Sequence, residues 1–192
     1  MPRIEPVPME ELEPEVRESL EKSVASGAIA STIVQQIMAY NRGMLRLQVG
    51  MPGPVEMGVL LEPRLLELVR LRSAQIGGCA ECAAARYGGL VNEEEVSCLI
   101  IGQDGDLTER ERLAVKFITL VHTDHHSIGD ELYLELKSVF STAEIVELSL
   151  YVASNVGLHR VLHTWDLHGT EPPAIAFDPA DVVDAVPAFF GG

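Results

Sequence analysis

The sequence predicts an all-α protein, and three observations support that fold class. Alternation of apolar and polar residues, the pattern of a half-buried strand, is nowhere sustained. Apolar residues instead recur at helical spacing through most of the chain. Three capping boxes, each a short polar residue followed three positions later by glutamate, mark helix starts at Asn92, Thr108 and Ser141. We therefore expect helices over about 92–101, 108–121 and 141–165, and another over 129–140.

The first third of the chain is expected to hold two helices. An acidic amphipathic helix spans about 10–24, where Pro14 suits the first helical turn. Thr32 can cap a second helix that runs to about Val49 and is stopped by the glycines and prolines of 50–54. The apolar stripe of this second helix comprises Ile33, Ile37, Tyr40, Met44 and Leu47.

The middle of the chain combines a longer apolar helix with a short one. Residues 62–76 carry leucine, valine and isoleucine at helical spacing, and Gly77-Gly78 ends this helix. A short helix from Cys79 to about Tyr87 follows. Cys98 lies in an apolar run and is expected to be an inert core residue.

The chain is expected to form a single domain over residues 1–192. A length of 192 residues with 47% hydrophobic and 22% charged residues fits one globular core. The last 24 residues, 169–192, contain four prolines that exclude a regular helix. This tail is also apolar, so we expect it to pack along the body or across a neighbouring subunit.

Charge and hydropathy exclude two classes of partner. The formal net charge of −15 repels phosphate backbones, so no nucleic-acid partner is expected. No apolar run approaches the ~20 residues of a membrane span, so no membrane partner is expected either. The N-terminus lacks the basic and apolar regions of a signal peptide, which predicts a cytoplasmic protein.

The motif Gly77-Gly78-Cys79-Ala80-Glu81-Cys82 carries the chemistry of this chain. Two thiols three residues apart can close a disulfide and so transfer two electrons. A helix start at Cys79 favours the thiolate there, because the unpaired N–H groups and the helix dipole stabilise negative charge. A closed zinc site usually takes four ligands, and the chain has no second cysteine pair. We expect neither a metal nor a cofactor.

The cysteine motif is part of the longer run Glu67-x2-Arg70-Leu71-Arg72-x-Ala74-x2-Gly77-Gly78-Cys79-x2-Cys82-x3-Arg86. This run resembles the carboxymuconolactone decarboxylase superfamily and, within it, the alkyl hydroperoxidase D (AhpD)-like branch. Stretches at 107–111, 141–148 and 155–157 also look like the second half of the family domain, so the likeness covers about 30–168. The resemblance implies an AhpD-like helical bundle and obligate oligomers.

The resemblance also implies roles for individual residues. In the AhpD-like branch the second cysteine attacks the peroxide and the first resolves the sulfenic acid, which makes Cys82 peroxidatic, Cys79 resolving and Glu67 the proton-relay carboxylate. The helix-start argument favours Cys79 as the thiolate instead, so the identity of the nucleophile stays open. Glu67 can alternatively form an ordinary surface pair with Arg70 or Arg72.

Two positions depart from the family pattern. Arg86 stands where the branch usually has histidine, and Glu81 stands where another histidine can precede the second cysteine. Arginine steadies a thiolate but stays protonated, so it cannot shuttle a proton near neutral pH. The expected catalytic set is therefore Cys79, Cys82, Glu67 and Arg86, with weak activity that Arg86→His should raise.

Other histidines are candidates for the missing relay. His159 and His163 lie four apart, on one face of the last expected helix, and His168 follows its end. Surface or packing positions are the plainer interpretation; a proton relay and a metal site are the alternatives. A second group, His122, His125 and His126, is expected in a solvated loop.

Three functions remain open at this point. The first is a thiol-dependent peroxidase-like oxidoreductase whose partners are a hydroperoxide and an external thiol or dithiol reductant. The second is a lactone acid decarboxylase or isomerase, the other activity of the superfamily. The third is a non-catalytic dithiol protein that senses or binds. A homo-oligomer is expected, because the predicted helices and tail carry more apolar surface than one small domain buries.

Overall fold

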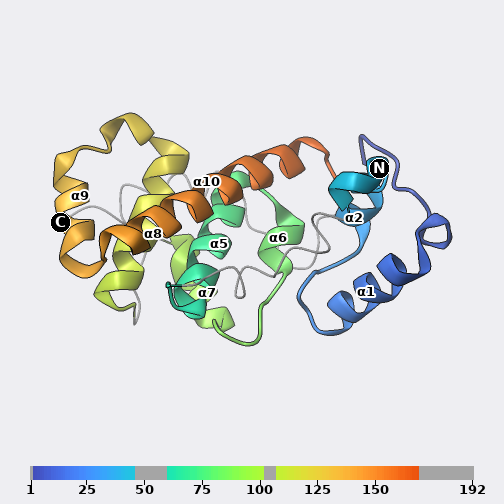
Figure 1. Ribbon diagram of the computed structural model, residues 1–192, viewed down its shortest axis with the longest axis horizontal. Helices are drawn as coiled ribbons and strands as arrows, with labels where there is room; N and C mark the ends of the chain where they lie inside the picture. Colours follow the sequence, from blue (N-terminus) through green and yellow to red (C-terminus); the bar gives the residue numbers. More distant parts are fainter. Residues whose placement is uncertain (1, 46–59, 102–106, 169–192) are drawn as a thin grey trace.

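The structure is a computed structural model that describes residues 2–45, 60–101 and 107–168. Within these residues the chain is all-helical and contains no strand, which confirms the predicted fold class (Figure 1). In chain order the elements are η1 (Met9–Glu11), α1 (Pro14–Ala25), α2 (Ile33–Met38), α5 (Pro63–Gly77), α6 (Ala80–Ala84), α7 (Glu93–Ile101), α8 (Glu109–Thr123), η2 (His125–Ser127), α9 (Asp130–Val139) and α10 (Thr142–Thr164).

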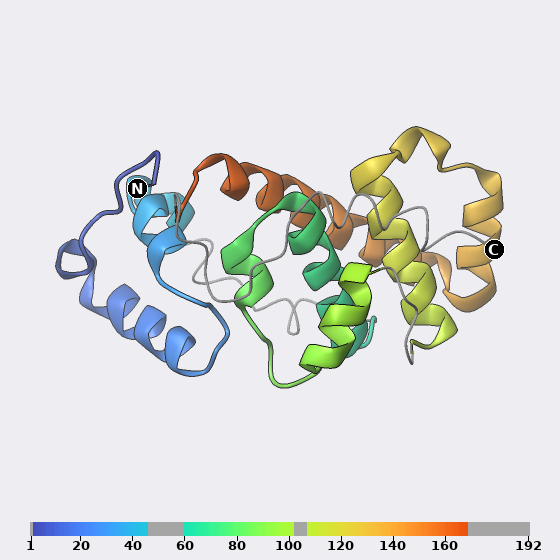
Figure 2. The same ribbon diagram turned by 180° about the vertical axis from the view of Figure 1, so that it is seen from behind.

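Helix α5 is the centre of the fold. It packs against α8 and α10, and it also contacts α6 and α7. Every residue from Leu65 to Gln75 is buried, the polar ones included. Helix α10 runs across α5 from the end of the molecule that holds α9 to the end that holds α2 (Figures 1 and 2).

The apolar core divides into clusters around these helices. The main cluster joins α5, α8, α9 and α10, and a second one joins α5, α7 and α8. A third cluster joins α2 to the dithiol and to the C-terminal end of α10, through Val34, Ile37, Cys79, Leu162 and Leu167. This third cluster holds α2 beside the cysteine pair. Among the described helices, none is long and apolar enough to cross a membrane.

The predicted helix starts and stops are confirmed at several points. Thr108 and Ser141 form complete capping boxes, and Asn92 exchanges the equivalent pair of hydrogen bonds with Glu95. Pro14 is the first residue of α1, preceded by the short η1 rather than by a helix from residue 10.

Gly77-Gly78 ends α5 as predicted, and α10 explains why both positions are glycine. Gly78 has φ 69°, in the left-handed region that favours glycine. A Cβ on Gly77 would lie 2.8 Å from the Cβ of His159, and one on Gly78 would lie 2.7 Å from Nδ1 of His163. The two glycines therefore let α10 approach the end of α5 closely.

The prediction of one helix from Thr32 to about Val49 is wrong. Helix α2 ends at Met38, and a turn follows before helical structure resumes at Arg42. Asn41 explains the break, because its Oδ1 accepts a hydrogen bond from the Met44 N–H (3.1 Å) and so offers the backbone a new helix start. Two members of the expected apolar stripe, Tyr40 and Met44, are 68% and 56% exposed, while Leu47 and Val49 lie outside the described residues.

Two further expectations concern Cys98 and the tail. Cys98 is a free thiol and only partly buried, so it is not the fully buried core residue that the apolar run predicted. The proline-containing tail, 169–192, lies outside the described residues.

Candidate dithiol site

Cys79 and Cys82 form a disulfide in the structure. Cys79 is the N-cap of α6, and the two Cα atoms are 5.3 Å apart. Cys79 Sγ also accepts a hydrogen bond from the backbone N–H of Cys82 (3.3 Å). Cys79 is only 2% exposed, whereas Cys82 is partly exposed, so the second cysteine is the more accessible one.

Cys82 lies in the wall of a cavity of about 130 Å³. The loop before α2, α2 itself, α5, α6 and the C-terminal half of α10 all contribute to this cavity, and these elements converge in Figure 1. Its apolar wall includes Ile29, Val34, Leu158 and Leu162. Its polar lining consists of Ser31, Gln35, Arg70, Glu81, Tyr87, Asn155 and His159. The cavity therefore presents a half-apolar, half-polar surface to the dithiol.

Glu67 and Arg70 form a buried ion pair behind this cavity. Arg70 donates from Nε to Oε2 of Glu67 and from Nη2 to Oε1, each at 2.7 Å. The backbone N–H of Tyr87 donates to the same Oε1 (3.2 Å). Glu67 therefore pairs with Arg70, as one sequence interpretation expected, but it does so at 1% exposure rather than on the helix surface. Both carboxylate oxygens are engaged.

Arg70 joins this pair to the dithiol helix. Its guanidinium donates to the backbone carbonyls of Cys82 (2.5 Å) and Ala85 (2.9 Å), and it lies 4.7 Å from the centre of the Tyr87 ring. Burial alone would lower the pKa of Arg70, but the hydrogen bonds and charge of Glu67 outweigh it and raise the pKa. The charged pair therefore acts as a bracket that holds the C-terminal end of α6.

A chain of three buried side chains leads from the cavity into the bundle. His159 Nδ1 lies 2.9 Å from Ser73 Oγ, which in turn lies 2.8 Å from Nε2 of His122. A hydroxyl can donate to one ring and accept from the other. Burial lowers the pKa of His159 to about 3, with Arg70 adding to the effect, and lowers the pKa of His122 to about 4. Both imidazoles are neutral near pH 7.

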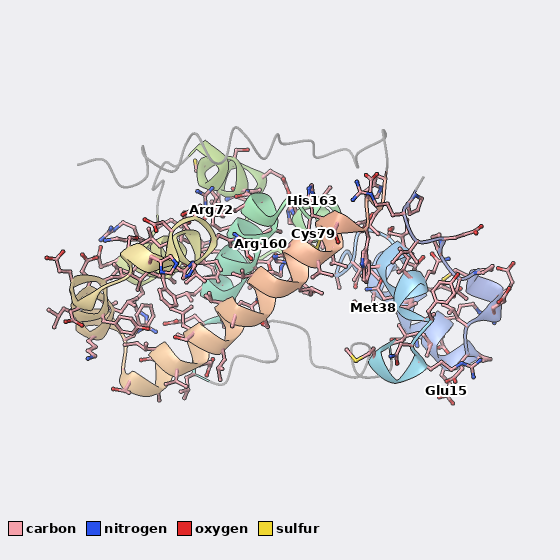
Figure 3. The ribbon with its side chains drawn as sticks, turned by 90° about the horizontal axis from the view of Figure 1, so that it is seen from above. Glu15, Met38, Arg72, Cys79, Arg160 and His163 are labelled. Atoms are coloured by element: carbon pink, nitrogen blue, oxygen red, sulfur yellow. A yellow bond between two sulfur atoms is a disulfide. The ribbon has the colours of Figure 1, made fainter. Side chains whose placement is uncertain are left out.

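The other histidines lie in different surroundings. His122 was expected in a solvated loop, and this prediction is wrong: it lies in α8 and is buried, because the helix extends past Val121 to Thr123. His125 and His126 are exposed, as expected. His163 is exposed and its Nδ1 lies 3.0 Å from the carbonyl of Gly78, directly before Cys79 (Figure 3).

Glu81, between the two cysteines, is buried and connects the dithiol to the loop before α2 and to the last described residue, His168. It accepts a hydrogen bond from Ser31 Oγ, and its Oε1 lies 2.9 Å from Nε2 of His168. The His168 contact has the distance of an ion pair when the imidazole is protonated, without hydrogen-bond geometry. Glu81 thus places one carboxylate in the wall of the cavity.

Arg86 makes contacts on the outer side of α6. It donates to both oxygens of Glu93, at 2.8 and 2.9 Å, and to the carbonyls of Ala83 and Ala85. It is not among the residues that line the cavity beside Cys82. The structure therefore brings Cys82 and the Glu67–Arg70 pair together and places Arg86 in a separate surface pair.

Metal binding receives no support from the described part of the chain. No group of three or more histidine, cysteine, aspartate and glutamate side chains is arranged there to hold a metal ion. The pairing of His159 and His163 as metal ligands is also disfavoured, because His159 is buried and bound to Ser73 while His163 is exposed.

Sequence reasoning missed several residues of the site. Arg70 was expected only as a possible surface partner of Glu67 and received no role in the site, and Ser73, Tyr87 and Gln35 received none either. A signal existed for two of them: Arg70 and Ser73 lie three and six residues after Glu67, which places all three on one side of α5. Gln35 gave no signal, because a glutamine on a short polar-apolar helix reads as an ordinary surface residue.

Comparisons with known proteins add no assignment to this picture. No family model matches the chain, and neither does any curated protein or any solved structure. The resemblance of the run that begins at Glu67 to the AhpD-like branch stays a prediction.

Proposed function

We propose that this chain is a thiol-dependent peroxidase-like oxidoreductase that reduces hydroperoxides with Cys79 and Cys82. The observation that supports it most directly is the asymmetry of the two sulfurs. Cys82 borders a cavity, while Cys79 is buried at bridging distance behind it. This arrangement suits an attacking thiolate that meets a substrate and a resolving thiol that does not.

Cys82 is the nucleophile in the proposed reaction. The Cys82 thiolate attacks the terminal oxygen of ROOH, so that an S–O bond forms, the O–O bond breaks and an alkoxide leaves. The alkoxide takes a proton to become ROH. The Cys79 thiol then attacks the sulfenic sulfur, an S–S bond forms, and the hydroxide released takes the Cys79 proton to become water. An external thiol or dithiol reductant returns two electrons and two protons to the disulfide.

His159 is the histidine that we assign to proton transfer in this reaction. Of the histidines in the described residues, it is the one that lines the cavity together with Cys82. Its low pKa of about 3 means that the ring does not store a proton near neutral pH. Because the ring lines the cavity and Ser73 fixes it at Nδ1, we assign it to a transient transfer from the Cys82 thiol to the alkoxide.

The lactone acid decarboxylase is less well supported. Its substrate carries carboxylates, which call for a free cation in the binding site. Among the residues that line the cavity, the one guanidinium belongs to Arg70, and Glu67 already neutralises it. A dithiol sensor without turnover is the second candidate, and the contacts of Glu81 with Ser31 and His168 favour it, because they link the redox motif to the loop before α2 and to the segment after α10.

A homo-oligomer is part of the proposal. Three apolar side chains of α10 outside the cavity are exposed at spacings that place them on one side of the helix: Val146, Leu150 and Val161. An exposed apolar stripe on a long helix is typical of a protein–protein contact.

Stopped-flow mixing of reduced protein with a peroxide panel tests the proposed function. Wild type should lose two thiols per peroxide, and Cys82→Ser should lose none. Cys79→Ser should stop at a sulfenic acid that dimedone traps on Cys82. A reversed pattern, with reactivity retained in Cys82→Ser, would assign the nucleophile to Cys79. Absence of thiol loss in wild type would favour the dithiol sensor over the peroxidase.

A further inference from the structure

The cavity beside Cys82 contains a buried amide whose acceptor has no partner within the described part of the chain. Gln35 is only 6% exposed, it lines the cavity from α2, and its Oε1 receives no hydrogen bond there. A buried acceptor left unpaired costs free energy, so such a group points to a ligand that donates to it. Hydroperoxides offer this donor in their terminal O–H.

The size and the charge of the cavity limit the rest of the ligand. Its volume of about 130 Å³ is close to the ~150 Å³ of an apolar cavity that holds benzene, a molecule of six non-hydrogen atoms. Ile29, Val34, Leu158 and Leu162 provide contact for a short alkyl group. Glu81 adds a carboxylate to the wall, so an anionic ligand is disfavoured.

We propose that Gln35 is a substrate-positioning residue that holds the O–O–H group of a small, uncharged hydroperoxide against Cys82, and that Leu158 at the outer side of the cavity limits the alkyl group to about four carbons. This inference rests on the proposed peroxidase function. It gives α2 a part in a site whose nucleophile lies on α6. The cluster of Val34, Ile37, Cys79 and Leu162 holds these elements together.

Gln35→Leu tests the positioning role, because leucine keeps the approximate volume and removes both amide groups. One neutral hydrogen bond is lost, so kcat/KM for tert-butyl hydroperoxide should fall about tenfold. Gln36→Leu is the matched control: its amide donates to the Val7 carbonyl and it does not line the cavity. Equal kcat/KM values in the two variants would overturn the role of Gln35.

Leu158→Ala tests the size limit. Wild type should prefer tert-butyl hydroperoxide, with six non-hydrogen atoms, over the bulkier cumene hydroperoxide. The variant enlarges the cavity at its outer side and should shift the ratio of the two kcat/KM values toward cumene hydroperoxide by at least fivefold. Leu150→Ala, on the same exposed side of α10 but outside the cavity, should leave the ratio unchanged. An unchanged ratio in Leu158→Ala would overturn the size limit.

A third measurement separates this inference from the peroxidase itself. If wild type reduces no hydroperoxide, the proposed function fails, and alkylation of reduced Cys82 then tests the cavity alone. Iodoacetamide is neutral and carries N–H donors, whereas iodoacetate is anionic. Their rate ratio at Cys82 should exceed the ratio at Cys98 at least fivefold, and Gln35→Leu should reduce it. Equal ratios at the two cysteines, unaffected by Gln35→Leu, would refute selection by the cavity whatever the peroxidase result.

Discussion

Replacing Glu67 by glutamine tests whether this carboxylate is a bracket or a proton relay. Glu67→Gln removes the negative charge that receives two hydrogen bonds from Arg70 and one from the Tyr87 N–H. The new amide NH₂ faces donors, and burial then lowers the pKa of Arg70 without the opposing effect of Glu67, but an arginine starts from a pKa of 12.5 and stays charged near neutral pH. The variant therefore leaves a buried cation without its counter-charge.

The expected loss of stability is large. Removing one partner of a buried ion pair costs about 3–5 kcal/mol, a considerable share of the 5–15 kcal/mol typical of a domain. The double variant Glu67→Gln/Arg70→Met removes both charges and should recover most of that loss. Glu93→Gln is a matched control, because it breaks the more exposed pair with Arg86 and should cost less than about 1 kcal/mol.

Urea unfolding of the oxidised protein, followed by circular dichroism, measures these differences, and stopped-flow thiol loss measures the chemistry in parallel. A bracket predicts low stability for Glu67→Gln and partial rescue in the double variant. A relay predicts near-wild-type stability with a rate reduced 10²–10⁴-fold. A loss below 1 kcal/mol would refute the bracket, and additive losses in the double variant would show that the two side chains act independently.

Four further outcomes are expected. One equivalent of oxidant should remove two thiols from reduced protein and leave Cys98, as measured by thiol titration; covalent dimers as the sole product would contradict this. The pKa of His122 is lowered to about 4, so between about pH 6.5 and pH 4 the unfolded chain binds more protons than the folded one, and the free energy of unfolding should fall as the pH drops through this range. The variant His122→Gln should flatten this slope. A flat profile in wild type would refute the linkage between His122 and stability. Because Arg86 does not line the cavity, Arg86→His should leave the peroxidase rate unchanged, whereas His159→Gln should lower it about 10²-fold. A faster rate in Arg86→His would support the sequence-based prediction that position 86 is the relay position. Light scattering at micromolar concentration should show an oligomer that Leu150→Glu dissociates, and a monomeric wild type would refute the contact through α10.

The sequence predicted the helices best where the signal is local. A capping box joins residues three apart, so Thr108, Ser141 and Asn92 could each be assigned without knowledge of the fold. The same locality explains the failure after Met38. The apolar spacing favoured one long helix, but Asn41 competes for the Met44 N–H and starts a new segment.

The site was predictable only in its covalent part. Two cysteines three residues apart on a helix start can be recognised from sequence, and the structure pairs them. The surroundings depend on residues that are distant in the chain. Gln35 comes from α2 and His159 from α10, and no periodicity in either helix shows that both border Cys82.

The polar side of α5 shows why burial escaped the sequence. Glu67, Arg70 and Ser73 follow at steps of three residues, a pattern that on an isolated helix indicates a solvated face. In the structure each of these polar groups has a buried partner: Glu67 and Arg70 pair with each other, and Ser73 meets imidazoles from α8 and α10.

These buried partners also fix where the cavity lies. Ser73 holds His159 of α10 about one helical turn before Gly77, where the missing side chain lets the same histidine approach α5 closely. Arg70 holds the carbonyls at the end of α6, which positions Cys82. One face of α5 therefore holds two of the elements that line the dithiol cavity, because Arg70 binds α6 and Ser73 binds α10. A change in either bond is expected to alter the distance between the Cys82 sulfur and the His159 imidazole, and α5 is therefore the element on which the proposed chemistry depends.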